Sequence, residues 1–235
     1  LFCGNTALES ATRMKTQQKL RIAVIAGGPS SEYTVSLKTG RMVFKNLDRK
    51  KYAPTLITIS KTERWPITFH HLKKNFDCAF IAMHGEYGED GTVQKLLDAH
   101  RIRYTGSGAR ASRIGMDKIR SAKLFLKQGL SIPPFHAIEH LQHLEQKLSF
   151  PLVIKPADRG SSVGVTIVRE EKQFITALNR AKKVSGKIIV QKFIPGRELT
   201  CGVIEINKKL KTLPPTEIVP RVSKFFDYKA KYAKK

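Results

Sequence analysis

In the amino-terminal part of the chain, hydrophobic residues form short unbroken runs that are separated by polar stretches. Residues 20–26 are such a run, and the two glycines and polar turn that follow are typical of a buried strand leading into a helix. Similar runs predict strands at residues 55–59, 78–83 and 103–105. Between the last two, helical spacing is found at Val93, Leu96, Leu97 and His100. The order strand, helix, strand predicts parallel pairing and a small doubly wound α/β domain.

A different pattern begins at Asp117, where Ile119, Ala122 and Leu126 share one face of a predicted helix that Gly129 ends. Later apolar runs predict strands at residues 150–155, 163–168 and 187–193, and a helix at 170–182. Residues 198–206 and 209–213 predict a hairpin that turns at Asn207 and Lys208. This half is therefore predicted to be a mixed α+β module, with a glycine-rich turn between its first two strands.

Composition excludes disorder as a description of the whole chain, because 41% of its 235 residues are hydrophobic. No apolar run approaches the ~18 residues of a membrane-spanning helix, which predicts a soluble protein without a membrane partner. The three cysteines, Cys3, Cys78 and Cys201, are far apart and show no spacing of a disulfide framework or zinc site. We expect reduced thiols in a cytoplasmic protein, with Cys78 and Cys201 as small buried hydrophobic residues.

The chain is strongly basic, with 43 Lys and Arg against 19 Asp and Glu and a formal charge of +24. Such a charge attracts nucleic acid, anionic membranes or phosphorylated small molecules. A basic nucleic-acid-binding domain is one alternative, but aromatic residues are not interleaved with the basic clusters as in single-strand binders. We therefore expect a solvated basic face and no nucleic-acid partner.

Two possible motifs do not support the function that they suggest. Residues 106–111 match a loose dinucleotide-binding pattern, but no acidic residue follows at ~20 residues to hold a ribose. The second group is His136, His140 and His143, which lack an HExxH arrangement and are assigned to a polar surface helix.

The loop at residues 155–164 carries a stronger signal. Two glycines and two serines can direct backbone N–H groups and hydroxyls toward one anion. Lys155 adds a positive charge at the end of an apolar strand, where an ordinary polar hairpin would not need one. The loop is therefore predicted to cover phosphates.

Together with this loop, three other stretches resemble the D-alanine–D-alanine ligases of the ATP-grasp superfamily, in the order of that family. They are residues 26–36, residues 82–91, and residues 104–108 continuing to Met116, Asp117 and Lys118. Residues 226–232 are similar to the beginning of the family's mobile loop over the active site. The resemblance covers residues 19–235.

The resemblance implies a parallel-sheet, Rossmann-like α/β domain at residues 19–106, which binds substrate. A central α+β ATP-grasp domain is implied at residues 107–193. Residues 194–235 are expected to begin a C-terminal ATP-grasp domain that is incomplete in this chain. Residues 1–18 are expected to be an extension outside the fold.

The implied activity is the ATP-dependent ligation of two D-alanines through an acyl phosphate, for synthesis of a peptidoglycan precursor. Glu32 is expected to hold the ammonium of the first D-alanine and His84 to lie near its carboxylate. Ser161 and Tyr232 match residues that are linked to the Glu32 position by hydrogen bonds. With Glu32, they form the expected catalytic group.

The resemblance also implies an ATP site. Its expected residues are Lys118, Lys155 and Lys231 at the phosphates, Gly160, Ser161, Ser162 and Val163 in the loop, Gln191, Lys192 and Ile194 at the adenine, and Glu198 at the ribose.

The family binds ATP with Mg²⁺ (or Mn²⁺), and its metal ligands follow the mobile loop. We therefore expect no metal ligand in this chain, and the chain is expected to be inactive alone. Glu205 and Asn207 imitate the family's Glu-x-Asn pair but lie on the predicted hairpin and are not assigned to metal. A homodimer is also implied. The related ligases that join D-alanine to D-lactate stay an alternative, although Tyr232 favours the dipeptide.

Overall fold

The computed structural model of the chain describes residues 18–138 and 149–219. Its first part is built on a three-stranded sheet in the order β2-β1-β3. The strands are β1 (Leu20–Gly27), β2 (Tyr52–Ile59) and β3 (Cys78–Ile81). Both pairings are parallel, which confirms the prediction for this half. The predicted strand at residues 103–105 is reduced to a single bridge between Ala79 and Tyr104.

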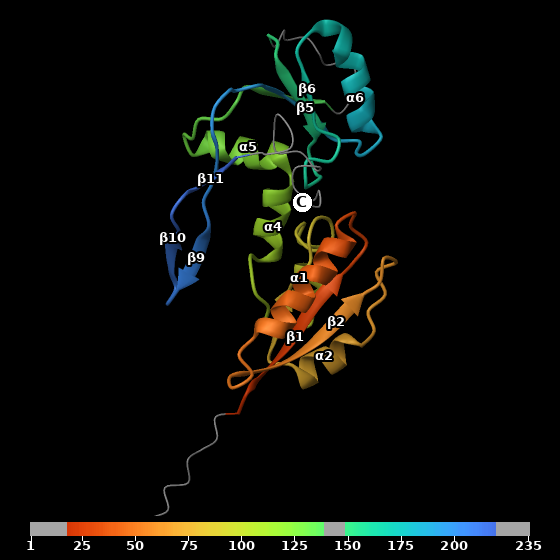
Figure 1. The fold of residues 1–235 in the computed structure, drawn as a ribbon, viewed down its shortest axis with the longest axis vertical. Helices are drawn as coiled ribbons and strands as arrows, with labels where there is room; N and C mark the ends of the chain where they lie inside the picture. Colours follow the sequence, from red (N-terminus) through yellow and green to blue (C-terminus); the bar gives the residue numbers. More distant parts are fainter. Residues whose placement is uncertain (1–17, 139–148, 220–235) are drawn as a thin grey trace, which may run out of the picture.

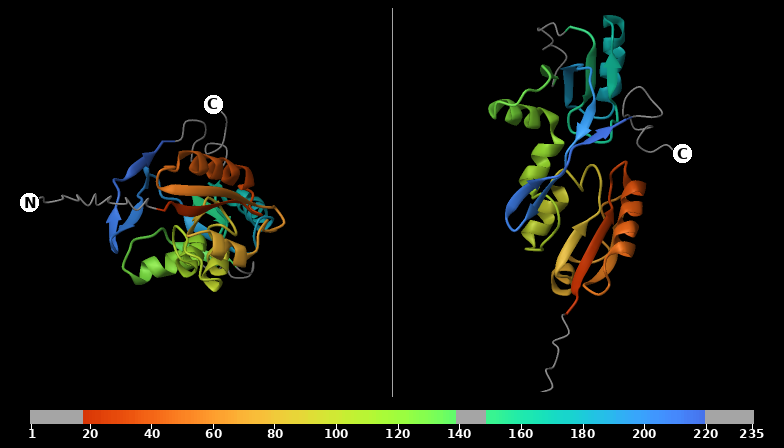
Figure 2. Two further views of the ribbon diagram at one scale, coloured as in Figure 1. Left: turned by 90° about the horizontal axis from the view of Figure 1, so that it is seen from below. Right: turned by 60° about the vertical axis from the view of Figure 1, so that its left-hand side comes forward.

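Helices cover both faces of this parallel sheet, as the left view of Figure 2 shows. They are α1 (Tyr33–Asn46), α2 (Phe69–Asn75) and α3 (Thr92–Ala99). Successive strand residues point to opposite faces, so Ala23 and Ile25 of β1 pack with the residues of α2 and α3. Val24 instead faces Val43 of α1. The hydrophobic pattern did not predict α2, because its seven residues bury only Leu72.

Two short helices connect this part to the next one: α4 (Ala109–Met116) and α5 (Lys118–Lys127). In Figure 1 they lie between the two sheets. Asp117 separates them and accepts hydrogen bonds from the backbone N–H groups of Ile119 and Arg120. Such a side-chain cap satisfies donors that the first turn of a helix leaves unpaired, so α5 begins at Lys118.

The second sheet has four antiparallel strands in the order β4-β7-β5-β6. They are β4 (Phe135–Ile138), β5 (Leu152–Pro156), β6 (Thr166–Val168) and β7 (Ile188–Lys192). A 3-10 turn (Glu171–Gln173) leads into α6 (Phe174–Lys182), which packs on one face of this sheet. On the other face, Ile189 packs against Ile119 of α5.

The assignment of His136 to a surface helix was wrong. His136 lies in β4, where it pairs with Val190 of β7. A four-residue strand between prolines and polar residues has too little periodicity to be recognised, and here the pairing with β7 decides its structure. His140 and His143 lie outside the described residues.

Four short strands follow: β8 (Glu198–Thr200), β9 (Val203–Ile206), β10 (Lys209–Thr212) and β11 (Thr216–Ile218). The β9–β10 hairpin is confirmed, and its turn residues Asn207 and Lys208 have φ angles of 51° and 62°, as a two-residue turn of primed type requires. The single strand predicted at residues 198–206 was wrong, because β8 pairs with β11 instead of continuing into β9.

The environment of the two described cysteines differs from the expectation. Cys201 is exposed, because it stands in the break between β8 and β9. Cys78 is half-buried, and this burial raises the pKa of its thiol. Neither cysteine forms a disulfide. None of the helices in the described part of the chain combines the length and the apolar character that a membrane crossing requires.

Candidate active site

The candidate site begins at the carboxyl end of β1, the edge of an open α/β sheet at which ligands bind. Gly27 has a φ of 92°, and a Cβ there would lie 2.2 Å from the carbonyl oxygen of Ile59. Only glycine fits this close approach. The Gly27 N–H donates to the Ser36 hydroxyl, which in turn donates to the carbonyl of Ala82. These bonds fix the first turn of α1 against both the end of β1 and the segment after β3.

Glu32 is the N-cap residue of α1 and is only 5% exposed. The hydroxyl of Ser161 donates a hydrogen bond to Glu32 Oε1. A Cβ on Gly85 would lie 3.0 Å from Glu32 Oε2, and one on Gly160 would lie 3.6 Å from it. Three loops that are distant in the sequence therefore meet at one carboxylate. The resemblance implied this contact with Ser161; the roles of the two side chains stay a proposal.

His84 lies between two polar side chains. Its Nε2 is 2.9 Å from the Thr39 hydroxyl on α1, and its Nδ1 is 3.8 Å from Glu89 Oε1. The interaction with Glu89 raises the pKa of His84 against the opposing effect of burial, and the charges of Glu89 and Glu32 add to the rise.

Glu89 is held from a second side, since its Oε2 accepts a 2.8 Å hydrogen bond from the Gly85 N–H. Burial opposes ionisation of this carboxyl, but the ion-pair contact with His84 and the hydrogen bond from the Gly85 N–H outweigh it and lower the pKa of Glu89. The arrangement therefore favours an imidazolium beside a carboxylate.

The glycine-rich loop between β5 and β6 has unusual backbone angles. Ser161 and Ser162 have φ angles of 51° and 59°, a region that side chains other than glycine rarely adopt. Gly164 follows at 72°, and a Cβ there would lie 3.0 Å from Pro156 Cγ and 3.2 Å from Val184 Cγ2. Because the chain still turns here, β6 begins at Thr166 instead of residue 163. Positive φ angles in succession are typical of anion-binding turns and of strained functional loops.

Two of the lysines expected at ATP phosphates border this loop. Lys118 opens α5, and its Nζ donates a 2.6 Å hydrogen bond to the carbonyl of Arg159. Lys155 lies on β5 opposite Ile189, and burial lowers the pKa of its amine. Alternation along β7 puts Gln191 on the same sheet face as Ile189 and Lys155. Lys155, expected at the phosphates, and Gln191, expected at the adenine, therefore share a face of the sheet.

Other expected ATP residues are less closely gathered. Lys192 points to the opposite face from Gln191, and its Nζ donates to the Ser149 hydroxyl at 2.6 Å. Ile194 and Glu198 are exposed, Ile194 just beyond β7 and Glu198 at the beginning of β8. Lys231 and Tyr232 lie outside the described residues.

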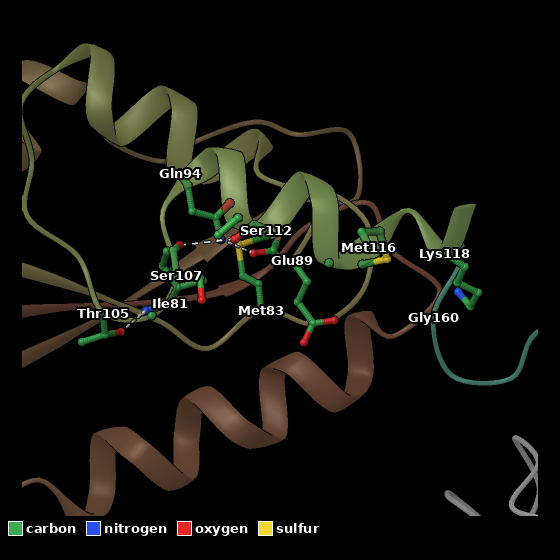
Figure 3. A pocket seen from close by; sticks show the side chains of 14 residues that line it. Ile81, Met83, Glu89, Gln94, Thr105, Ser107, Ser112, Met116, Lys118 and Gly160 are labelled. Carbon is green, nitrogen blue, oxygen red and sulfur yellow. Dashed lines mark hydrogen bonds between the residues drawn. The ribbon is translucent and has the colours of Figure 1, made fainter. Parts of the chain in front are cut away.

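Cavities open on two sides of the glycine-rich loop. One, of about 560 Å³, is lined by residues that include Glu89, Lys118, Gly160, Gln94 and Ser112. Figure 3 shows Glu89 and Lys118 reaching its edge from different elements. A second, of about 340 Å³, is lined by Pro29, Ser30, Ser31, Glu86, Arg159, Val163 and Val184. Carboxylates from the first sheet's loops thus face cations from α5 and the glycine-rich loop.

Comparison with known proteins agrees with this geometry. Residues 21–72 and 66–107 match the family model "D-ala D-ala ligase N-terminus", and residues 124–235 match "D-ala D-ala ligase C-terminus". The D-alanine–D-alanine ligase of Thermotoga petrophila is 39% identical over 215 residues, which are 92% of this chain and 69% of that protein. This chain belongs to the D-alanine–D-alanine ligase family.

Solved structures of this ligase family have the same fold. The ATP complex of the Bacillus anthracis D-alanine–D-alanine ligase is 37% identical, with a TM-score of 0.73, covering 88% of this chain and 68% of that one. The VanG D-Ala:D-Ser ligase of Enterococcus faecalis is 30% identical with a TM-score of 0.77, covering 92% and 74%. The predicted architecture, a parallel α/β domain followed by an α+β ATP-grasp module, is therefore confirmed.

Some side chains of this ligase site were not singled out by sequence reasoning. Thr39, Glu86, Glu89 and Arg159 make polar contacts that join the loops around Glu32 and His84. Glu86, Glu89 and Arg159 lie within stretches that carry the family resemblance, so the signal was present but did not specify partners. Thr39 gave no signal, because a single threonine on an amphipathic helix is unremarkable without its tertiary neighbours.

Proposed function

We propose that this chain binds ATP and D-alanine and ligates two D-alanines through an acyl-phosphate intermediate. The observation that supports this most strongly is the hydrogen bond from Ser161 to Glu32. It joins a loop of phosphate-binding character to a buried carboxylate at the beginning of α1. One site can thereby hold an amino acid and a nucleotide at the same time.

In the proposed first step, the carboxylate of one D-alanine attacks the γ-phosphate of ATP. Two unit charges of the same sign at about 4 Å repel by about 4 kcal/mol at an effective dielectric constant of 20. Lys118 and Lys155, with Lys231 beyond the described residues, are proposed to offset this repulsion. The loop residues Gly160, Ser161, Ser162 and Val163 are proposed to cover the phosphates and exclude water.

The first D-alanine is proposed to lie between Glu32 and His84, with its ammonium on the carboxylate and its carboxylate near the imidazole. The raised pKa of His84 supports the cationic form that this contact needs. The amine of the second D-alanine then attacks the acyl phosphate and phosphate leaves. Tyr232, outside the described residues, is proposed to join Ser161 in closing the site.

For the nucleotide base, we propose a slot formed by Gln191, Lys192 and Ile194, with Glu198 at the ribose. The position of Gln191 on the same sheet face as Lys155 supports this arrangement. The side chain of Lys192 is directed toward Ser149, so its contribution is proposed to come from the backbone.

We also propose that ATP is used with Mg²⁺, which would neutralise phosphate charge when bound. The described residues do not fit such a site, because nowhere in 18–138 and 149–219 do three or more His, Cys, Asp or Glu side chains come together to hold a metal. A homodimer and a cytoplasmic location are proposed from the family resemblance, and the free thiols of Cys78 and Cys201 support the latter.

The decisive experiment is nucleotide binding to Lys155→Met, which removes the charge of a half-buried lysine and retains much of its volume. A hydrogen bond to a charged group contributes about 1.5–3 kcal/mol, so ATP affinity is expected to fall roughly 10- to 100-fold. Calorimetric titration of the chain with ATP measures this, and Lys123→Met, an exposed lysine of α5, is the matched control. Unchanged ATP affinity in Lys155→Met would contradict the proposed site.

A further inference from the structure

The guanidinium of Arg159, in the glycine-rich loop, makes polar contacts with two residues, Glu86 and Asp158. Its Nε lies 3.2 Å from Glu86 Oε1, on the loop that carries His84. Its Nη1 donates to the carbonyl of Asp158 at 3.3 Å and lies 3.6 Å from Asp158 Oδ1. Both members of the Arg159–Glu86 pair are half-buried. The flat guanidinium, with its fixed fork of donors, can serve Glu86 and Asp158 together, which a lysine amine cannot do in the same way.

The backbone of the same residue contacts the nucleotide side of the proposed site. The carbonyl of Arg159 accepts the hydrogen bond from Lys118 Nζ. Two residues later, Ser161 donates to Glu32. The segment from Arg159 to Ser161 therefore contacts the lysine proposed to bind phosphate, Lys118, and the carboxylate proposed to bind the substrate ammonium, Glu32. The ion pair with Glu86 holds this segment at its Arg159 end.

We propose that Arg159 is a positioning residue, whose ion pair with Glu86 couples the binding of ATP to the binding of the first D-alanine. This inference rests on the proposed function. A nucleotide that orders the glycine-rich loop also orders the His84 loop through this pair, and an amino acid at Glu32 and His84 has the reverse effect. Such coupling is reciprocal by thermodynamic necessity. The cavity of about 340 Å³ supports it, because Glu86 and Arg159 both line this space between the loops.

The test exchanges the two charges. We measure the dissociation constant of ATP with and without saturating D-alanine for the full chain, for Arg159→Glu, for Glu86→Arg and for the double variant. Half-exposed ion pairs contribute modestly, so D-alanine is expected to tighten ATP binding roughly two- to five-fold in the unaltered chain. Each single variant is expected to reduce this ratio to about one, and the double variant to restore it.

Arg21→Glu is the matched control, because Arg21 forms a comparable pair with Asp77 at 2.9 Å near the opposite edge of the parallel sheet. It is expected to leave the ratio unchanged. A ratio that survives in Arg159→Glu, or that the double variant fails to restore, overturns the inference. Arg159→Lys is the conservative variant, and it is expected to restore only part of the ratio.

Hydrogen exchange of the ligand-free chain provides a readout that does not depend on activity. Amides from Gly160 to Gly164 are expected to exchange faster in each single variant and at the original rate in the double variant. If the unaltered chain does not bind ATP, the proposed function fails and the coupling fails with it. If ATP binds but the double variant does not restore protection, only the role of Arg159 is overturned.

Discussion

The pair formed by His84 and Glu89 is expected to stabilise the fold by an amount that depends on pH. We consider Glu89→Gln, which removes the charge but keeps an oxygen for the Gly85 N–H. At a separation of 3.8 Å, two unit charges interact by about 1 kcal/mol in water. Partial exposure and side-chain ordering reduce this, so the pair is expected to contribute about 0.2–1 kcal/mol to stability.

The pH window follows from the directions of the two pKa shifts. His84 has a pKa raised from 6.5. Its contribution to folding stability is therefore complete below pH 6.5 and is lost as the pH rises through the raised pKa. Glu89 has a pKa lowered from 4.5, so its contribution is complete above that pH and is lost as the pH falls through the lowered value. Stabilisation by the pair is therefore greatest between about pH 4.5 and pH 6.5.

The assay is a set of urea unfolding curves for the unaltered chain and Glu89→Gln at several pH values, with an NMR titration of the His84 ring. The variant is expected to be less stable at pH 5.5, to approach the stability of the unaltered chain as the pH rises through the raised pKa of His84, and to have a lower His84 pKa. Glu32 still faces the ring, so part of the rise is expected to remain. Glu171→Gln, at an exposed carboxylate in the 3-10 turn before α6, is the control. A pH-independent stability difference, or an unchanged His84 pKa, would refute the reasoning.

Two further predictions concern the contacts around Glu32. Ser161→Ala removes a hydrogen bond to an ionised group, and because Glu32 keeps other interactions we expect the lower part of the usual range, about 1.5 kcal/mol. The dissociation constant of D-alanine should rise about tenfold in a binding assay, whereas Ser121→Ala, which loses a bond to Ile114, should affect stability alone. Equal effects of both variants on D-alanine binding would contradict a substrate role. Gly85→Ala places a Cβ 2.4 Å from Ser30 Oγ at a φ of 71°, so thermal unfolding should occur roughly 2–10 °C lower. Gly186→Ala is the control, because a Cβ there meets open space, and it should unfold near the original temperature. An equally small change in unfolding temperature for Gly85→Ala would contradict the close packing around Glu32.

Much of the fold follows from the sequence because its signals are local. Unbroken apolar runs identify strands buried on both faces, as β1 confirms with six consecutive buried residues. The turn at Asn207 and Lys208 is likewise set by residue type, since asparagine tolerates a positive φ. Elements without such signals were missed or misplaced. The strand β4 and the helix α2 are short, and their structure depends on neighbours that pack against them.

The sequence by itself determined the family, the order of the elements and the residues with suitable chemistry, such as Glu32, His84 and Lys155. Only the tertiary structure decided which of them touch. Thr39 meets His84, Arg159 meets Glu86, and Ser161 meets Glu32, although each pair is separated by many residues. The physical reason is that side-chain chemistry and periodicity are properties of neighbouring residues. Contacts across a cleft arise when packed sheets and helices bring distant loops within hydrogen-bonding distance, and no local pattern encodes that distance.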